Sequence, residues 1–172
     1  MTEQVKLLQV KVMDPELVGK LSELLVDVVQ DGASVGFLPP LSMEAAAAYW
    51  LDALNPGVLL WVAVREERVV GTVQLQLAMK ANGSHRAEIA KLMVDPKARR
   101  GGIARLLMQT AEKAAKEEAR TLLLLDTRDG DPSNHLYRSL GYIEAGRIPQ
   151  FARSSSGELH TTVLYYKLCQ IE

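Results

Sequence analysis

The chain has 172 residues, 48% of them hydrophobic, and its 20 Lys and Arg residues against 21 Asp and Glu residues give a formal net charge of −1. This length predicts one domain over residues 1–172, and the near-neutral charge argues against nucleic acid or an anionic membrane as a partner. The single cysteine, Cys169, excludes an internal disulfide framework and a thiolate metal site. The N-terminus lacks a signal-peptide layout and no apolar run is long enough to span a bilayer, so we expect a cytoplasmic protein.

The first third of the chain predicts a strand followed by two helices. Asp14 and Ser42 are residue types that cap helix N-termini, and Pro15 suits a first helical position. The predicted elements are a strand at 5–12, a helix from Asp14-Pro15 to about Gln30, a loop at 32–40, and an alanine-rich helix from Ser42 to about Leu54.

The middle of the chain predicts neighbouring antiparallel strands. Residues 58–64 form a continuous apolar run, whereas residues 69–77 alternate between apolar and polar, as in a sheet with one face better buried. The polar residues 65–68 join these strands as a hairpin. Asn82-Gly83 indicates another hairpin, which leads into a strand at 86–94.

The last third predicts two more helices and three strands. They are a helix at 102–119, a short apolar strand at 122–125, a helix from an Asp131-Pro132 cap to Gly141, and final strands at 142–146 and 162–168 around a polar loop at 149–160. The complete order is β-α-α-β-β-β-α-β-α-β-β. This order indicates an α/β protein with a mixed sheet and helices on both faces.

Residues 99–104 read Arg-Arg-Gly-Gly-Ile-Ala and lie between an apolar strand and a helix. Glycines let the backbone approach an anion closely, and the N–H groups and positive dipole end of the following helix can hold a phosphate. The position of this segment therefore predicts a phosphate-binding loop.

The element order and two motifs resemble the GCN5-related N-acetyltransferases. The acetyl-CoA loop of that family, Gln/Arg-x-x-Gly-x-Gly/Ala, is matched at Arg99, Gly102 and Ala104. A second family segment, Asn-x-x-x-Tyr-x-x-x-Gly-Tyr/Phe, is mirrored by residues 134–142, with the asparagine and tyrosine only three positions apart. Residues 32–40 and 87–94 are similar to the tabtoxin-resistance-type branch of the family, which does not by itself define a substrate.

The resemblance implies a mixed, mostly antiparallel sheet of about seven strands, splayed at the cofactor site and flanked by about four helices. It implies direct transfer of an acetyl group from acetyl-CoA, the co-substrate, to a primary amine of a small amino acid-like or toxin-like molecule. A protein N-terminal or lysine acetyltransferase and a non-catalytic acyl-CoA-binding module are alternatives. No metal is expected, and the protein is expected to be a monomer or homodimer.

The resemblance also implies how the cofactor is held. The main chain of Met93 and Val94 would bind the pantetheine arm, and one of their N–H groups would polarise the thioester carbonyl. Asn134 would bond the pantetheine or an ordered water, unless it is only a polar residue in the first turn of its helix. The loop residues that would hold the pyrophosphate are Arg99, Arg100, Gly101, Gly102, Ile103 and Ala104.

Three residues are candidates for proton transfer. Tyr137 would be the general acid that protonates the departing thiolate, unless it only packs in the core. Glu88, a carboxylate within an otherwise apolar strand, is the preferred general base; alternatively it pairs with Arg86 or Lys91. Asp126 follows the apolar residues 122–125 and is the second candidate base, unless it caps the next turn.

Charge is distributed unevenly along the chain. Residues 12–64 contain seven acids and one lysine, a net of −6, whereas residues 65–120 contain twelve bases and seven acids, a net of +5. This division predicts a cationic or zwitterionic amine acceptor beside a polyanionic cofactor, unless the bias is chance surface composition.

Overall fold

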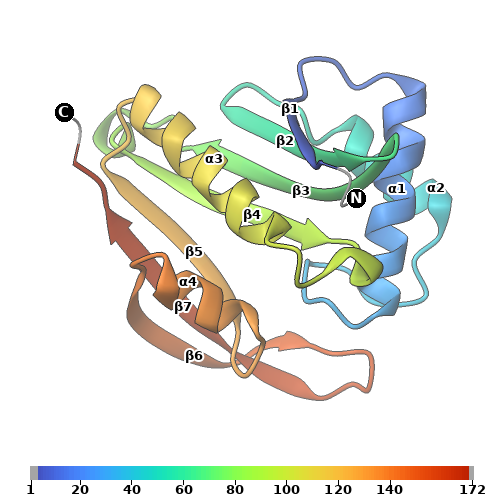
Figure 1. Ribbon diagram of the computed structural model, residues 1–172. Coiled ribbons are helices and arrows are strands. Elements are labelled where there is room, and N and C mark those ends of the chain that lie inside the picture. Colours follow the sequence, from blue (N-terminus) through green and yellow to red (C-terminus); the bar gives the residue numbers. More distant parts are fainter. Residues whose placement is uncertain (1–3, 171–172) are drawn as a thin grey trace.

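The computed structural model describes residues 4–170 and builds one seven-stranded sheet in the order β1-β2-β3-β4-β5-β7-β6 (Figure 1). All neighbouring strands are antiparallel except β4 and β5, which run parallel. The strands are β1 (Lys6–Gln9), β2 (Val58–Arg65), β3 (Arg68–Leu77), β4 (Arg86–Val94), β5 (Leu122–Arg128), β6 (Ile143–Arg153) and β7 (Leu159–Leu168). The expected mixed, mostly antiparallel seven-stranded sheet is confirmed.

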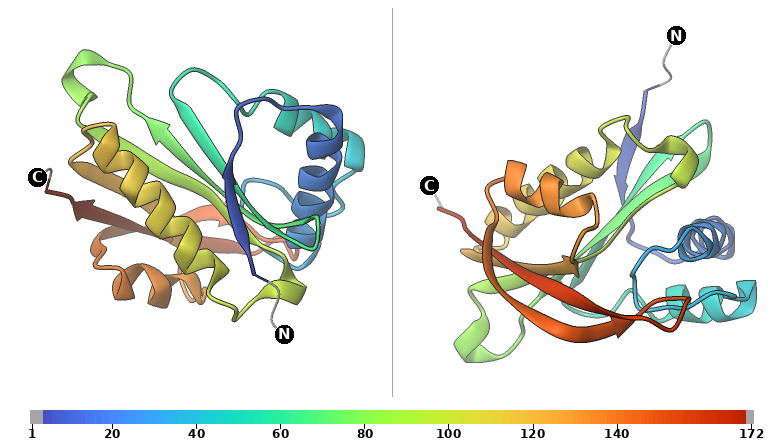
Figure 2. Two further views of the ribbon diagram at one scale, coloured as in Figure 1. Left: turned by 45° about the horizontal axis from the view of Figure 1, so that its top comes forward. Right: turned by 90° about the horizontal axis from the view of Figure 1, so that it is seen from below.

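Four α-helices in the described residues cover the sheet, with α1 and α2 on one face and α3 and α4 on the other (Figure 2). They are α1 (Pro15–Gln30), α2 (Met43–Leu51), α3 (Ile103–Glu117) and α4 (Ser133–Ser139). The predicted caps of the first two are confirmed. The Asp14 side chain accepts from the Leu17 N–H at 2.9 Å, and Ser42 Oγ accepts from the Ala45 N–H at 3.1 Å.

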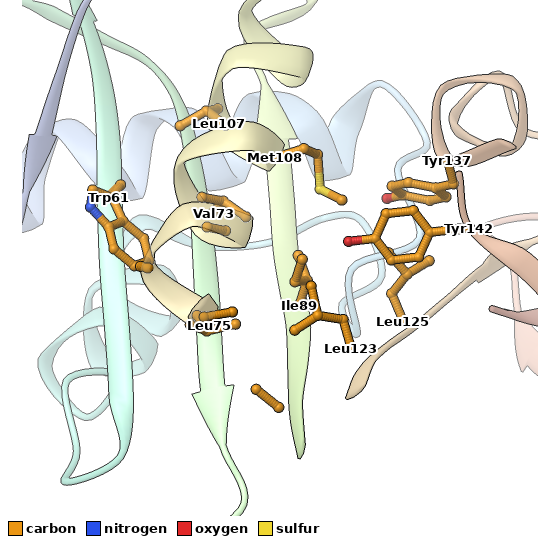
Figure 3. Close-up of a cluster of buried hydrophobic side chains, with 14 of the residues drawn as sticks. Trp61, Val73, Leu75, Ile89, Leu107, Met108, Leu123, Leu125, Tyr137 and Tyr142 are labelled. Atoms are coloured by element: carbon orange, nitrogen blue, oxygen red, sulfur yellow. The ribbon is translucent and has the colours of Figure 1, made fainter. Parts of the chain in front are cut away.

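Each face of the sheet has its own apolar core. The core under α3 includes Leu107 and Met108, both fully buried, with Tyr137 and Tyr142 at its edge (Figure 3). Gly71 on β3 lets α3 approach closely, because a Cβ there would meet the backbone oxygen of Met93 and side chains of α3 at about 3.0–3.1 Å. The opposite core joins α1, α2 and the sheet.

The predicted alternation along β3 is wrong in one respect. Both faces are buried, because helices cover both sides of the sheet. Register shifts also interrupt the pattern between β2 and β3 and between β3 and β4. As a result Val69 packs in the core under α1, whereas Val73 and Leu75 pack in the core under α3. An added residue in one strand reverses which face the following side chains reach.

Three further differences concern a loop, a helix cap and a turn. Residues 149–160 are not a polar loop but part of the long β6–β7 hairpin, whose edge strand β6 is largely exposed and so tolerates polar residues. Asp131 does not cap α4, since its Oδ1 accepts from Arg128 Nε at 2.9 Å and the capping position is Pro132. Asn82-Gly83 lies in a short 3-10 turn rather than a two-residue hairpin.

The parallel strands β4 and β5 separate partway along their length. They pair only where residues 86–88 face residues 122–124. Beyond Glu88, β4 continues to Val94 paired with β3 alone, and a bulge puts Lys91 at a φ of 52°. Within residues 4–170, one edge of β4 therefore has no strand partner beside the opening between β4 and β5.

Candidate active site

The opening between β4 and β5 widens into a cavity of about 960 Å³. One wall is formed by β4, by the turn into α3 and by the start of α3. The other wall is formed by β5, α4 and the β6–β7 hairpin, and the loop after α1 closes one side. The cavity therefore collects segments from both halves of the chain.

Met93 and Val94 lie at the unpaired edge of β4 and line the cavity. The Met93 side chain is 3% exposed and packs in the core under α1. Since packing engages the side chain, the backbone groups on the cavity side remain able to bind a ligand. This geometry is compatible with the expectation that Met93 and Val94 both pack in the core and offer their main chain to the cofactor.

The turn from β4 into α3 presents backbone donors at the cavity. Arg100 and Gly102 have φ angles of 65° and 76°, and α3 begins at Ile103 with no side-chain cap. Among the described residues, no backbone or side-chain group accepts from the N–H groups of residues 102–105. Uncapped donors at a helix N-terminus form an anion-binding site. Gly101 is the one predicted loop residue that does not line the cavity.

The arginines near this turn have different partners. Arg99 Nη1 donates to Asp31 Oδ2 at 2.6 Å and so connects the turn to the end of α1. Arg105 Nη2 donates to Ser139 Oγ at 2.7 Å. Arg100 also lines the cavity, and no side-chain carboxylate within residues 4–170 lies within ion-pair distance of it. Arg100 is thus the least engaged of these cations.

Tyr137 belongs both to the core and to the cavity wall. The residue is 7% exposed, and its ring centroid lies 6.0 Å from that of Tyr142 (Figure 3) and 6.0 Å from that of Tyr165. It nevertheless lines the cavity from α4. Burial, with Asp126 and Asp131 nearby, raises the pKa of the phenol well above its usual value. The hydroxyl is therefore protonated at neutral pH and able to act as a proton donor.

Asn134 does not line the cavity. Its Nδ2 donates to the carbonyl oxygens of Arg128 and Asp131, both at 2.9 Å. Its Oδ1 accepts from the Tyr165 hydroxyl at 2.7 Å. These bonds hold the turn between β5 and α4, so the structural alternative considered from the sequence fits this residue.

Glu88 and Asp126 lie on opposite sides of the opening. Desolvation, followed by the charge of Asp126, raises the pKa of Glu88, whereas Lys91 opposes the shift. No ion pair between Glu88 and Arg86 or Lys91 forms in the described chain, and the Arg86 guanidinium instead lies against Gly83. The ion-pair alternative for Glu88 is therefore wrong.

Asp126 lies within β5 rather than at its end. Its Oδ2 accepts from Thr162 Oγ1 of β7 at 2.9 Å, so it does not cap the following turn. The strand continues to Arg128 because β7 pairs with it throughout. The carboxylate lines the cavity and faces the region of Glu88.

Lys91 is a cavity residue that the sequence reasoning missed as a site candidate. Its Nζ donates to the Val35 carbonyl at 2.9 Å and lies 5.7 Å from the centre of the Tyr49 ring. Burial lowers the pKa of this ammonium, and the charges of Asp126 and Glu88 oppose the change. The sequence signal for a site residue was a lysine within an apolar strand. The face of the sheet that its side chain reaches, however, depends on the bulge.

The described residues show neither a metal-binding cluster nor a membrane-spanning helix. Within the described residues, no group of three or more His, Cys, Asp or Glu side chains is placed to hold a metal ion. No helix between residues 4 and 170 is long and apolar enough to cross a membrane.

The sheet thus opens between two parallel strands, and the uncapped N-terminus of α3 lies at the opening. The family model "Acetyltransferase (GNAT) family" matches residues 25–142. The chain therefore belongs to the GNAT acetyltransferase family, and the family resemblance is confirmed. Membership of the tabtoxin-resistance-type branch stays a prediction.

The relatives agree with this assignment. N-acetyltransferase 8B of Homo sapiens is 33% identical over 114 residues, which cover 65% of this chain and 50% of the human protein. The chain thus matches about half the length of this curated relative. An N-acetyltransferase from Staphylococcus aureus Mu50 has a TM-score of 0.81 at 16% identity, covering 96% of this chain and 98% of its own. The acetyltransferase yncA from Salmonella typhimurium, solved with acetyl-CoA, has a TM-score of 0.78 at 14% identity, covering 98% and 95%.

Proposed function

We propose that the protein is an acetyl-CoA-dependent N-acetyltransferase that transfers an acetyl group directly to a primary amine of a small amino acid-like or toxin-like molecule. One observation carries this proposal: the unpaired edge of β4 runs into the uncapped N-terminus of α3, both on the wall of one cavity. Family membership supports the same activity.

In this proposal the cofactor lies along the β4 side of the cavity. The backbone of Met93 and Val94 pairs with the pantetheine arm in place of a missing strand. The amides at the start of α3 bind the pyrophosphate, and Arg100 adds positive charge. One β4 N–H stabilises the oxyanion that forms at the thioester carbonyl.

The proton transfers are assigned to opposite walls. Glu88 takes a proton from the acceptor ammonium, directly or through water, and the neutral amine attacks the thioester carbon. The new C–N bond forms, the C–S bond breaks, and the thiolate takes a proton from Tyr137. The acylated nitrogen then loses its second proton, which returns through solvent to the Tyr137 phenolate, and Glu88 releases its proton to solvent. The raised pKa of Glu88 and the protonated phenol support these roles.

The test mixes acetyl-CoA with amino acids, polyamines and amine-bearing toxins and follows the release of free CoA thiol. We expect thiol release that depends on both the enzyme and an amine, together with binding of acetyl-CoA measured by calorimetry. Binding without thiol release from any amine would instead support a non-catalytic acyl-CoA-binding module. Absence of both would overturn the proposal.

A further inference from the structure

Lys91 is held at a defined position on the acceptor side of the cavity. The β4 bulge puts it in the left-handed region, and its Nζ bonds the Val35 carbonyl at 2.9 Å. This contact joins the middle of the sheet to the loop after α1, 56 residues earlier in the chain. An ammonium carries three donors, so one carbonyl leaves two donors for other partners.

The surroundings of Lys91 contain opposite charges that do not pair with it. Glu88 and Asp126 both act electrostatically on Lys91, yet neither carboxylate lies within the 4.0 Å ion-pair distance among the described residues. Asp126 is instead bonded by Thr162. A half-buried ammonium without a counter-ion is costly, and a ligand anion would offset that cost.

From this arrangement we propose that Lys91 binds an α-carboxylate of the acceptor, while Glu88 and Asp126 face its ammonium group. This inference rests on the proposed acetyltransferase function and narrows its acceptor to a free α-amino acid or a close analogue. The cluster presents one cation and two carboxylates to one cavity, the complement of a zwitterion. A substrate carrying only an amine would leave the Lys91 charge without a partner.

The bond to the Val35 carbonyl means that Lys91 also holds the loop after α1. The experiment must distinguish this effect from binding of the carboxylate. Arg128 of β5 also bonds this loop, with its Nη2 donating to the Gly32 carbonyl at 3.1 Å. A variant of Arg128 therefore loosens the same loop without removing the ammonium beside Glu88. Arg128 also lines the cavity, but its guanidinium is paired with Asp131, so it serves as the matched control both for the loop contact and for a second cation of the cavity.

The experiment compares L-amino acids with their α-carboxamides, which keep the side chain and the amine but lack the carboxylate charge. The amine of a carboxamide is the more acidic of the two, so intrinsic reactivity at neutral pH favours the carboxamide. We expect the enzyme to reverse this order and to favour the free acid by about tenfold or more in kcat/KM, mainly through KM. Lys91→Met should abolish the preference, Lys91→Arg should retain part of it, and Arg128→Met should leave it intact.

Other outcomes overturn the inference in identifiable ways. Equal or better activity with the carboxamides would do so and would point to a peptide N-terminus as acceptor. A preference that survives Lys91→Met, or that Arg128→Met removes equally, would leave Lys91 without a specific role in binding the carboxylate. Thiol release from polyamines alone would exclude a carboxylate-bearing acceptor and leave the acetyltransferase function standing.

Discussion

In the proposed reaction, two parts of the cavity would recognise their ligands by different means. The part proposed for the cofactor, named here the cofactor wall, is one continuous segment, residues 93–104, and it offers mainly backbone groups. The part proposed for the acceptor, named here the acceptor wall, is assembled from side chains on separate segments, with Glu88 and Lys91 on β4 and Asp126 on β5. Backbone recognition depends on local conformation, which a short motif can encode. Side-chain recognition depends on which strands become neighbours.

The largest expected effect concerns the acceptor wall. Glu88→Gln should lower kcat/KM by roughly 10³-fold, within the usual range for a general base. Because only the ionised carboxylate accepts a proton, kcat/KM should rise as the pH increases through the raised pKa of Glu88. Glu88→Gln should remove this acidic limb of the pH profile.

Asp126→Asn is the matched control for Glu88. The Asp126 charge raises the pKa of Glu88, so its loss should keep the limb and move it to lower pH. Acceptors whose amines differ in pKa must be compared, because titration of the amine produces a similar limb. Loss of the limb in Asp126→Asn, with retention in Glu88→Gln, would reverse the assignment of the base.

A smaller effect is expected at Tyr137, the proposed proton donor on α4. Tyr137→Phe keeps the ring packing and removes the proton, so kcat should fall by roughly 10²-fold with little change in acetyl-CoA affinity. Tyr142→Phe is the control, since Tyr142 lies in the same core but does not line the cavity. Steady-state measurements of thiol release compare the kcat of the two variants. Full activity in Tyr137→Phe would leave this residue with packing alone.

Features that depend on a local pattern or motif could be predicted from the sequence. They include the helix caps at Asp14 and Ser42 and the loop at 99–104. They also include the candidate residues Glu88, Asp126 and Tyr137, whose three side chains the structure brings to one cavity. The bulge at Lys91 depends on pairing with β3, so no local signal revealed it.

The two strands of the β6–β7 hairpin were predicted, but their length was underestimated for a related reason. An exposed edge strand lacks an apolar period, and only its pairing with β7 identifies it. The alternatives for Asn134 could not be separated from the sequence, because its contacts with Arg128 and Tyr165 form only when β5, α4 and β7 meet. Motif position predicted where this residue lies but not what its amide contacts.

The cofactor wall can be tested at Gly102. An aspartate there adds a side chain at positive φ and a negative charge beside the uncapped amides, so acetyl-CoA affinity should fall by about tenfold or more. Gly157→Asp is the matched control, because Gly157 has a φ of 86°, has the same open surroundings and does not line the cavity. Calorimetry measures both. Unchanged affinity in a folded Gly102→Asp protein would remove the phosphate assignment from this loop.

The smallest effect should come from the field of the whole chain. The basic segment, residues 65–120, carries a net charge of +5, whereas the acidic segment, residues 12–64, carries a net charge of −6. Asp31 is the only acid of the acidic segment on the cavity wall, and it is paired with Arg99. In the proposed reaction, the acidic segment would therefore act on the acceptor only at long range, whereas the basic segment would contact the polyanionic cofactor. A tenfold rise in ionic strength should lower kcat/KM by about fivefold for acetyl-CoA and by about twofold for a cationic acceptor such as lysine. Salt series at fixed pH measure both ratios, and a larger effect on the acceptor would show that the charge of residues 12–64 steers the acceptor more strongly than residues 65–120 steer acetyl-CoA.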